Sequence, residues 1–189
     1  MRGHRLLVTG ASGAGSTTLG RALATLRAVP HADVDDYLWL PTSPPYTHKR
    51  PVPDRLALMR ALFVPRDAWV LSGTLRGWGD SVIAETDAVV FLTVDTTTRM
   101  ERLLRREVVR YGETIEHGGS HAEAHRDFME WAHGYEDTEV PGRRAKDERW
   151  LAGLGHPVLR LDSGRPLEEL VTEVTGWLDG VAARGGRPS

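Results

Sequence analysis

The sequence predicts an α/β protein built on a parallel sheet of about five strands, with helices on both faces of the sheet. Short apolar runs alternate with longer segments of helical periodicity, which is typical of βαβ units. The run 88–94 is apolar throughout, as a strand covered on both faces should be. A glycine-rich segment at 10–15 follows the first apolar run and precedes the first helical pattern. The length of 189 residues fits a single domain over 1–189.

The expected elements follow from these patterns in chain order. Apolar runs predict strands at 4–8, 32–36, 69–73, 88–94 and 157–161. Apolar positions three and four residues apart predict helices after Gly15, at 54–63, at about 97–110, around 128–135 and at 167–181. Residues 37–53 are rich in proline and aromatic side chains and lack periodicity, so we expect a loop there.

Composition narrows the possible functions. The formal net charge is −2, with 24 lysine and arginine residues against 26 aspartate and glutamate residues, which argues against a general nucleic-acid or membrane-surface binder. There is no cysteine, so disulfides, thiolate zinc sites and cysteine nucleophiles are excluded. No apolar run approaches the ~20 residues of a membrane span. We therefore expect a cytoplasmic protein, monomeric or homodimeric, whose partner is a small molecule.

The segment Gly10–Thr17 has the spacing of a phosphate-binding loop, G-x-x-x-x-G-K-[ST], with Ser16 at the position of the lysine. Glycines allow backbone N–H groups to converge on phosphate oxygens, and the start of a helix adds a favourable dipole. A hydroxyl group such as that of Thr17 can hold Mg²⁺. The residues expected to bind the phosphates are Gly10, Ser12, Gly13, Ala14, Gly15, Ser16, Thr17 and Thr18.

Two other interpretations of this segment fit less well. Val8–Gly13 also resembles the opening of short-chain dehydrogenases, in which Asp33 would take a ribose hydroxyl. That motif requires glycine at position 16, and none of the four tyrosines is followed by the lysine of a Tyr-x-x-x-Lys pair. The other alternative is a glycine turn without a ligand, but three glycines at fixed spacing between a strand and a helix are costly.

Three aspartates, Asp33, Asp35 and Asp36, lie at the end of the second expected strand. In an open parallel sheet this end lies on the ligand side, next to the phosphate loop. Strand alternation would put Asp33 and Asp35 on one face of the sheet and Asp36 on the other. We expect Asp33 to hold a metal ion and Asp35 to accept or orient the attacking hydroxyl, with the two roles exchangeable. A solvated acidic turn is the alternative.

On these residues the sequence resembles the small P-loop kinases, which include adenylate kinase and other nucleoside-monophosphate kinases, shikimate kinase, gluconate kinase and uridine kinase. The loop 10–18 carries the resemblance together with two acidic motifs. Asp33-x-Asp35 resembles the strand end of shikimate kinase, and Asp35-Asp36-Tyr37 is similar to uridine kinase.

Further segments fit the same order. Residues 72–74 lie where the group has a substrate-facing loop, and 162–166, with Arg165, where it has an adenine-side loop. The resemblance implies a three-layer P-loop NTPase fold that uses ATP and Mg²⁺. It also implies a helical lid insertion, at about 111–147, that closes over the phosphates.

Arginines are the obvious replacements for the missing lysine, because a guanidinium can hold phosphate oxygens with two hydrogen bonds. The helix after the run 88–94 carries one basic stripe, formed by Arg99, Arg102, Arg106 and Arg110. Its expected core side consists of Met100, Leu103 and Leu104. In the kinase family, arginines at the end of this helix and in the lid grip the transferring phosphates. We expect Arg102 and Arg106 to do so here, with a solvated helix face as the alternative. The lid alternatives are Arg143, Arg144 and Arg149.

The expected substrate-side segment, about 37–68, begins with an aromatic and basic stretch suited to stacking a planar group and binding an anion. Together with residues after the third strand, the expected substrate-binding set is Asp36, Tyr37, Lys49, Arg50, Ser72, Gly73, Arg76 and Trp78. A covering loop packed on the core is the alternative.

Three histidines, His117, His121 and His125, lie four residues apart. A helical pair at this spacing can ligate zinc, but no carboxylate follows in the metalloprotease pattern. We therefore expect a solvated, mobile lid helix at these positions.

The sequence thus predicts an ATP- and Mg²⁺-dependent kinase that acts on a small acceptor such as a nucleoside, a nucleotide or a shikimate-like hydroxy compound. The alternative is a catalytically inactive nucleotide-binding P-loop protein with a regulatory or binding role, because the loop lacks its lysine.

Overall fold

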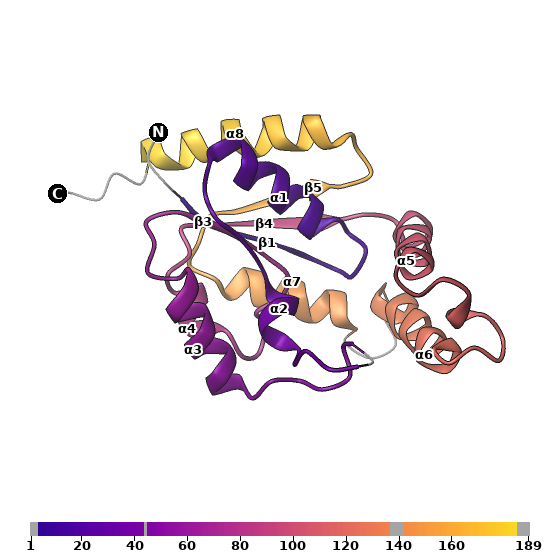
Figure 1. The fold of residues 1–189 in the computed structure, drawn as a ribbon. Coiled ribbons are helices and arrows are strands. Elements are labelled where there is room, and N and C mark those ends of the chain that lie inside the picture. Colours follow the sequence, from indigo (N-terminus) through magenta and orange to yellow (C-terminus); the bar gives the residue numbers. More distant parts are fainter. Residues whose placement is uncertain (1–3, 44, 137–141, 185–189) are drawn as a thin grey trace.

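A computed structural model describes residues 4–43, 45–136 and 142–184 (Figure 1). Five parallel strands form one sheet in the order β2-β3-β1-β4-β5. The strands are β1 (Arg5–Gly10), β2 (His31–Asp33), β3 (Trp69–Ser72), β4 (Ala88–Thr93) and β5 (Val158–Asp162). The predicted fold class, an α/β protein with a parallel sheet of this size, is confirmed.

Helices cover both faces of the sheet, which makes three layers. The helices are α1 (Ser16–Arg27), α2 (Val34–Leu38), α3 (Val52–Leu62), α4 (Asp80–Ile83), α5 (Thr96–Tyr111), α6 (Ala122–His133), α7 (Arg143–Gly153) and α8 (Leu167–Arg184), with 3₁₀ turns η1 (Gly112–Ile115) and η2 (Gly134–Glu136). Figure 1 shows α1 and α8 on one face, α2, α3, α4 and α7 on the other, and α5 with α6 beside the sheet. Among the described helices, none combines the length and apolar character needed to cross a bilayer.

Each face of the sheet has its own apolar core. Successive residues of a strand point to opposite faces, so Leu6 and Leu7 of β1 belong to different clusters. Leu6 packs in the cluster that contains Leu23 of α1 and Val174 of α8. Leu7 packs in the cluster that contains Met59 of α3. Burial on both sides explains why the central strands are apolar throughout.

The parallel register brings the carboxyl ends of the strands to one edge of the sheet. Val8 of β1 lies beside Ser72 at the end of β3, and Ser72 lies beside Asp33 at the end of β2. On the other side, Gly10 lies beside Leu92 of β4. The chain passes from β1 through α1 to β2 on one side of the sheet, and from β3 it crosses to β4 on the other side. In open α/β sheets, ligands bind where the connections change side in this way.

The second strand is shorter than predicted, and this changes the position of two aspartates. Strand β2 ends at Asp33, and α2 begins at Val34. Asp33 is the N-cap of α2, because its side chain accepts a hydrogen bond of 3.1 Å from the Asp35 backbone N–H. Asp35 and Asp36 therefore lie in the first turn of a helix, and the predicted strand alternation of the three aspartates is wrong.

The segment 37–53 contains more secondary structure than predicted. Tyr37 lies in α2, which ends at Leu38, and an isolated antiparallel bridge pairs Trp39 with Lys49. Helix α3 then begins at Val52, two residues before the expected start at Asp54. Position 44 lies outside the described residues.

Helix α5 buries a different face from the one predicted. Its buried residues are Arg99, Leu103 and Glu107, whereas Leu104 is 46% exposed. The expected core side is thus right for Leu103 and wrong for Leu104. Arg99 is 1% exposed, so the four arginines do not form one solvated stripe.

Helix α1 packs against β3 through a glycine, which gives a test of the fold. A Cβ atom on Gly20 would lie 2.1 Å from the Ser72 hydroxyl oxygen and 3.1 Å from His31 Nε2. We expect Gly20→Ala to lower the free energy of unfolding by about 1–3 kcal/mol, because the buried contact must open. Urea unfolding measures this change.

Gly176→Ala is the matched control, since Gly176 also lies in a helix and nothing lies within 4 Å of its Cβ position. This variant should be as stable as the parent or more stable by up to ~1 kcal/mol, from helix propensity alone. Equal stability of both variants would show that α1 does not approach β3 this closely.

Candidate active site

The segment between β1 and α1 forms a tight loop whose backbone amides are free to bind an anion. Gly13 and Gly15 have left-handed φ angles of 87° and 90°, and the Ala14 N–H donates to the Ala11 carbonyl over 2.9 Å. A Cβ atom on Gly13 would lie 2.8 Å from the Arg99 carbonyl oxygen, so the close approach requires glycine there. Gly15 caps α1 without a side-chain hydrogen bond, which leaves the first amides of α1 available.

Two residues predicted to hold a metal ion meet beside this loop. The Thr17 hydroxyl, in the first turn of α1, donates a hydrogen bond of 2.8 Å to Oδ2 of Asp33. The other oxygen of Asp33 caps α2. A hydroxyl and a carboxylate are hard oxygen ligands of the kind that Mg²⁺ takes together with phosphate oxygens and water. The donor set therefore fits Mg²⁺.

The three lid histidines do not assemble a metal site. His125 Nδ1 lies 3.8 Å from Glu107 Oε2, and the ring of His121 stacks on that of Tyr111. In the part of the chain that the structure describes, no three His, Asp or Glu side chains are grouped to hold a metal ion.

The Ser72 hydroxyl joins His31 of β2 to Ser16 at the end of the glycine loop through two hydrogen bonds. The hydroxyl of Ser72 is buried and donates to the Ser16 carbonyl over 3.0 Å, while His31 Nε2 lies 2.9 Å from the same hydroxyl. Because Ser72 donates its proton to Ser16, His31 must donate from Nε2. Burial lowers the pKa of His31, although the charge of Asp33 opposes this shift. The predicted substrate residue Ser72 is thus bonded to the loop, and the sequence analysis missed its partner His31.

Asp35 lies on α2, within the electrostatic reach of α5. The residue is exposed, yet desolvation of its carboxylate by the surrounding protein raises its pKa. The negative charge of Asp33 raises this pKa further. A hydrogen bond from Trp39 and the positive charges of Arg106 and Arg110 act in the opposite direction. The Asp35 carboxylate thus experiences both the negative charge of Asp33 and the positive charges of α5.

Arg102 connects the phosphate loop to the segment after β5. Its Nη2 donates to the Ser163 carbonyl over 2.8 Å, and its Nη1 lies 3.3 Å from the Ser163 hydroxyl. The same Nη1 is 3.8 Å from the position that a Cβ atom of Gly15 would occupy. Arg165, expected on this side, instead pairs with Glu169 at 3.3 Å and Glu173 at 2.6 Å.

Arg106 lies one turn further along α5. Its guanidinium stacks 5.5 Å from the ring centroid of Phe128, and its Nε is 3.6 Å from Glu107. Burial lowers the pKa of Arg106, and the neighbouring charge of Arg110 lowers it further, while Asp35 acts in the opposite direction. Asp35 and Arg106, both predicted to be catalytic, thus lie near enough for the charge of each to shift the pKa of the other.

Several predicted substrate residues have partners within the protein. Arg50 donates to the backbone carbonyl of Tyr37, and the Lys49 ammonium lies 5.6 Å from the Trp39 ring centroid. Arg76 Nε donates to Asp147 over 2.5 Å. The ring of Trp78 is covered by Arg55 at 5.0 Å.

The expected lid contains α6, and the alternatives Arg143, Arg144 and Arg149 all lie on α7. The guanidinium of Arg143 stacks 3.9 Å from the Trp131 ring centroid, and Arg144 pairs with Glu136 at 2.7 Å. Arg149 is exposed. Residues 137–141, also within the expected lid, lie outside the described residues.

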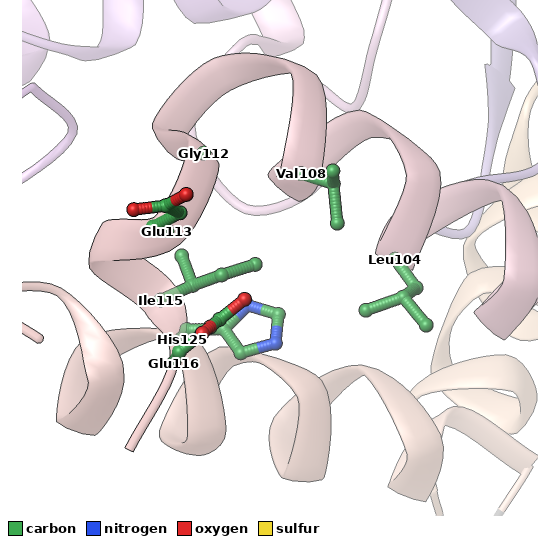
Figure 2. A pocket seen from close by; sticks show the side chains of 7 residues that line it. All are labelled: Leu104, Val108, Gly112, Glu113, Ile115, Glu116 and His125. Carbon is green, nitrogen blue, oxygen red and sulfur yellow. The ribbon is translucent and has the colours of Figure 1, made fainter. Parts of the chain in front are cut away.

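An apolar pocket of about 410 Å³ opens between α5, η1 and α6 (Figure 2). Leu104, Val108 and Ile115 form its apolar wall, and His125 lies at one side. Residues of the expected phosphate and metal sites do not line it.

A relative with a similar sequence places the chain in a family. The chain is 39% identical over 172 residues to uncharacterized protein YqaC of Bacillus subtilis (strain 168), a match that covers 90% of this chain and 95% of that protein. The chain belongs to the YqaC family. No protein-family model matches it.

The fold of this YqaC-family protein also occurs in solved kinases. A gluconokinase from Sinorhizobium meliloti 1021 has a TM-score of 0.55 at 20% identity, and the match covers 96% of this chain and 94% of the other. A shikimate kinase from Aquifex aeolicus vf5 has a TM-score of 0.54 at 15% identity, with coverages of 96% and 99%. These likenesses establish that the YqaC-family chain has the fold of small P-loop kinases.

The raised pKa of Asp35 predicts a pH-dependent stability. The folded state binds the Asp35 proton more tightly than the unfolded state, so the ionised carboxylate lowers stability at neutral pH. Asp35→Asn should raise the free energy of unfolding by about 0.5 kcal/mol at pH 7, a small effect because solvent screens the exposed group. The gain should vanish as the pH falls toward the ordinary value of 3.8. Urea unfolding between pH 3.5 and pH 7 measures it.

The same substitution at exposed Asp54, in the first turn of α3, controls for the loss of one negative charge. A destabilised Asp35→Asn variant at pH 7 would contradict the prediction.

Proposed function

We propose that this YqaC-family protein transfers the terminal phosphate of ATP to a small acceptor in a Mg²⁺-dependent reaction. The observation that carries the proposal is the 2.8 Å contact between Thr17 and Asp33 beside the glycine loop. This contact joins the Thr17 hydroxyl at the start of α1 to the Asp33 carboxylate at the end of β2, beside the loop that would hold the phosphates. The fold, shared with a gluconokinase and a shikimate kinase, supports the same class of reaction.

The amides of the loop and of the first turn of α1 would hold the phosphate oxygens. Thr17 and Asp33 would hold Mg²⁺, which neutralises charge on the transferring phosphate when it is bound. Ser16 stands where kinases of this fold carry a lysine, and the loss of such a charge-assisted contact costs roughly 1.5–3 kcal/mol. Arg102, beside Gly15, and Arg106, beside Asp35, are the residues proposed to replace that charge.

Asp35 is the proposed base for the acceptor. A hydroxyl oxygen of the acceptor attacks the terminal phosphorus, and the hydroxyl proton passes to the Asp35 carboxylate. The bond between that phosphorus and its bridging oxygen breaks, and ADP leaves. A raised pKa makes the Asp35 carboxylate a stronger base than an ordinary aspartate. A nucleoside, a nucleotide or a shikimate-like hydroxy compound is the proposed class of acceptor.

A second candidate rests on Ser16. A loop without its lysine can bind a nucleotide without turnover, and the protein would then have a regulatory or binding role. The deciding experiment measures transfer from radiolabelled ATP to a panel of nucleosides, nucleotides and hydroxy acids, with ATP binding measured in parallel. Transfer to one acceptor class supports the kinase, and ATP binding without any transfer supports the second candidate.

Substitution of Asp35 tests its role as a base. Asp35→Asn should slow phosphate transfer by about 10²–10⁴-fold, because no carboxylate remains at this position to take the hydroxyl proton of the acceptor molecule. ATP affinity should stay within twofold, since Asp35 lies outside the phosphate loop. Steady-state rates and calorimetry measure the two effects, with Asp80→Asn, in the first turn of α4, as the charge-matched control. An unchanged rate in Asp35→Asn would remove this residue from the mechanism.

Substitution of Arg106 tests the replacement of the lysine. Arg106→Ala should slow transfer by about tenfold or more, because one charge-assisted contact to the phosphates is lost. Arg105→Ala on the same helix is the control, since the Arg105 side chain is 78% exposed and pairs only loosely with Glu101. Equal rates in both variants would assign the charge to another residue.

A further inference from the structure

Arg99 is a buried cation at the phosphate loop that the proposed mechanism does not use. It lies in the first turn of α5 and is 1% exposed. Its Nη1 donates to the Ala132 carbonyl over 2.9 Å and lies 3.4 Å from the Ser12 carbonyl in the loop. A Cβ atom on Gly13 would lie 3.0 Å from Arg99 Cγ, so the side chain runs directly along the loop.

Half of the guanidinium has no hydrogen-bond partner. The Nε and Nη2 atoms of Arg99 are buried and make no hydrogen bond. These two nitrogens form one edge of the planar guanidinium, the edge that binds two oxygens of a single phosphate or carboxylate. The guanidinium carbon also lies 5.4 Å from the ring centroid of Tyr135.

Among the described residues, the nearby carboxylates are bonded elsewhere. Glu136 accepts from Arg144 over 2.7 Å. Asp147 accepts from Arg76 over 2.5 Å and from the Tyr135 hydroxyl over 2.8 Å. Arg143 adds a further positive charge, 5.8 Å from the same tyrosine ring. Among the described side chains, none of these carboxylates accepts a hydrogen bond from the buried guanidinium of Arg99.

A buried guanidinium without an anion is unfavourable, because it has lost its water without gaining a counter-charge. An anion at the free edge removes this imbalance. Because the guanidinium lies against Ser12 and Gly13, a phosphate held by the loop is the anion that its position favours. Arg102, three residues later on α5, donates to Ser163.

We propose that Arg99 binds two oxygens of the terminal phosphate of a nucleoside triphosphate through its Nε and Nη2 atoms. This inference rests on the proposed nucleotide site and adds a third positive charge to those proposed for Arg102 and Arg106. Ala132 at the end of α6 and Tyr135 of η2 cover the guanidinium. The phosphate reaches it when this cover shifts away from the loop.

The test compares the affinities of the protein for MgATP and MgADP by calorimetry in the parent protein, Arg99→Met and Arg99→Lys. In Arg99→Met the ATP dissociation constant should rise at least tenfold, whereas that for ADP should change less than twofold. Arg99→Lys keeps the positive charge but lacks the bidentate edge formed by Nε and Nη2. It should therefore weaken ATP binding by an intermediate factor. Arg105→Met on the exposed face of α5 should bind both nucleotides like the parent.

A stability measurement separates phosphate binding from a structural role. Without nucleotide, Arg99→Met should unfold at the same or a higher urea concentration than the parent, because an unpaired buried charge is replaced by an apolar chain. With saturating ATP, the variant should gain less stability than the parent. A residue that only supports the loop would give the opposite sign in the absence of nucleotide.

Three results would overturn the proposal. These are equal ATP affinity in Arg99→Met and the parent, an equal loss of ATP and ADP affinity, and, if the methionine variant does not fold, parental ATP affinity in Arg99→Lys. Phosphate transfer by the parent together with any of these results would leave the proposed function standing. A parent protein that binds neither nucleotide would overturn the proposed function and this inference together.

Discussion

The site depends on the parallel register of the sheet, which brings residues from distant parts of the chain to one edge. Asp33, Ser72 and Gly10 end three different strands, and each lies at this edge because all the strands run in the same direction. Helix α1 then starts from the central strand and points its first amides along the same edge. The Thr17–Asp33 hydrogen bond joins that helix to the outermost strand, so two crossovers of the chain meet in one contact.

Charge at this edge is supplied almost entirely by arginine. Lysine occurs at only two positions, Lys49 and Lys146, and neither lies in the loop. Guanidinium groups from a single helix, α5, approach the loop from two sides, Arg99 from below and Arg102 from the side of Ser163. An ammonium group at position 16 would reach the phosphates from within the loop. In the proposed function this charge comes instead from arginines of α5, so it would depend on the position of that helix.

Much of the fold could be predicted because its signals are local. The run 88–94 is apolar over its whole length, and the glycine spacing at 10–15 has few structural explanations. The end of β2 could not be predicted in the same way. Asp33 is compatible with a strand and is also a good helix cap, and the capping hydrogen bond to Asp35 decides between the two.

The site was predicted less completely, because a local sequence pattern does not show which polar side chains are buried or which distant residues contact each other. The spacing of Arg99, Arg102 and Arg106 indicates one basic face, but the packing of α5 against the loop and Ala132 buries the first of them. The cap at Asp95, which accepts from the Thr98 N–H over 2.8 Å, marks where α5 begins but not which of its residues are buried. The pair of His31 and Ser72 is separated by 41 residues and has no motif.

The double use of Asp33 restricts how this protein can evolve. One of its oxygens holds Thr17, and the other starts the helix that carries Asp35. A mutation to alanine would remove both contacts in a single step, so the Thr17 contact and the start of α2 depend on the same side chain. Keeping both contacts requires a short side chain with two acceptor oxygens, and asparagine, whose second terminal atom is an N–H donor, can accept at only one of the two positions.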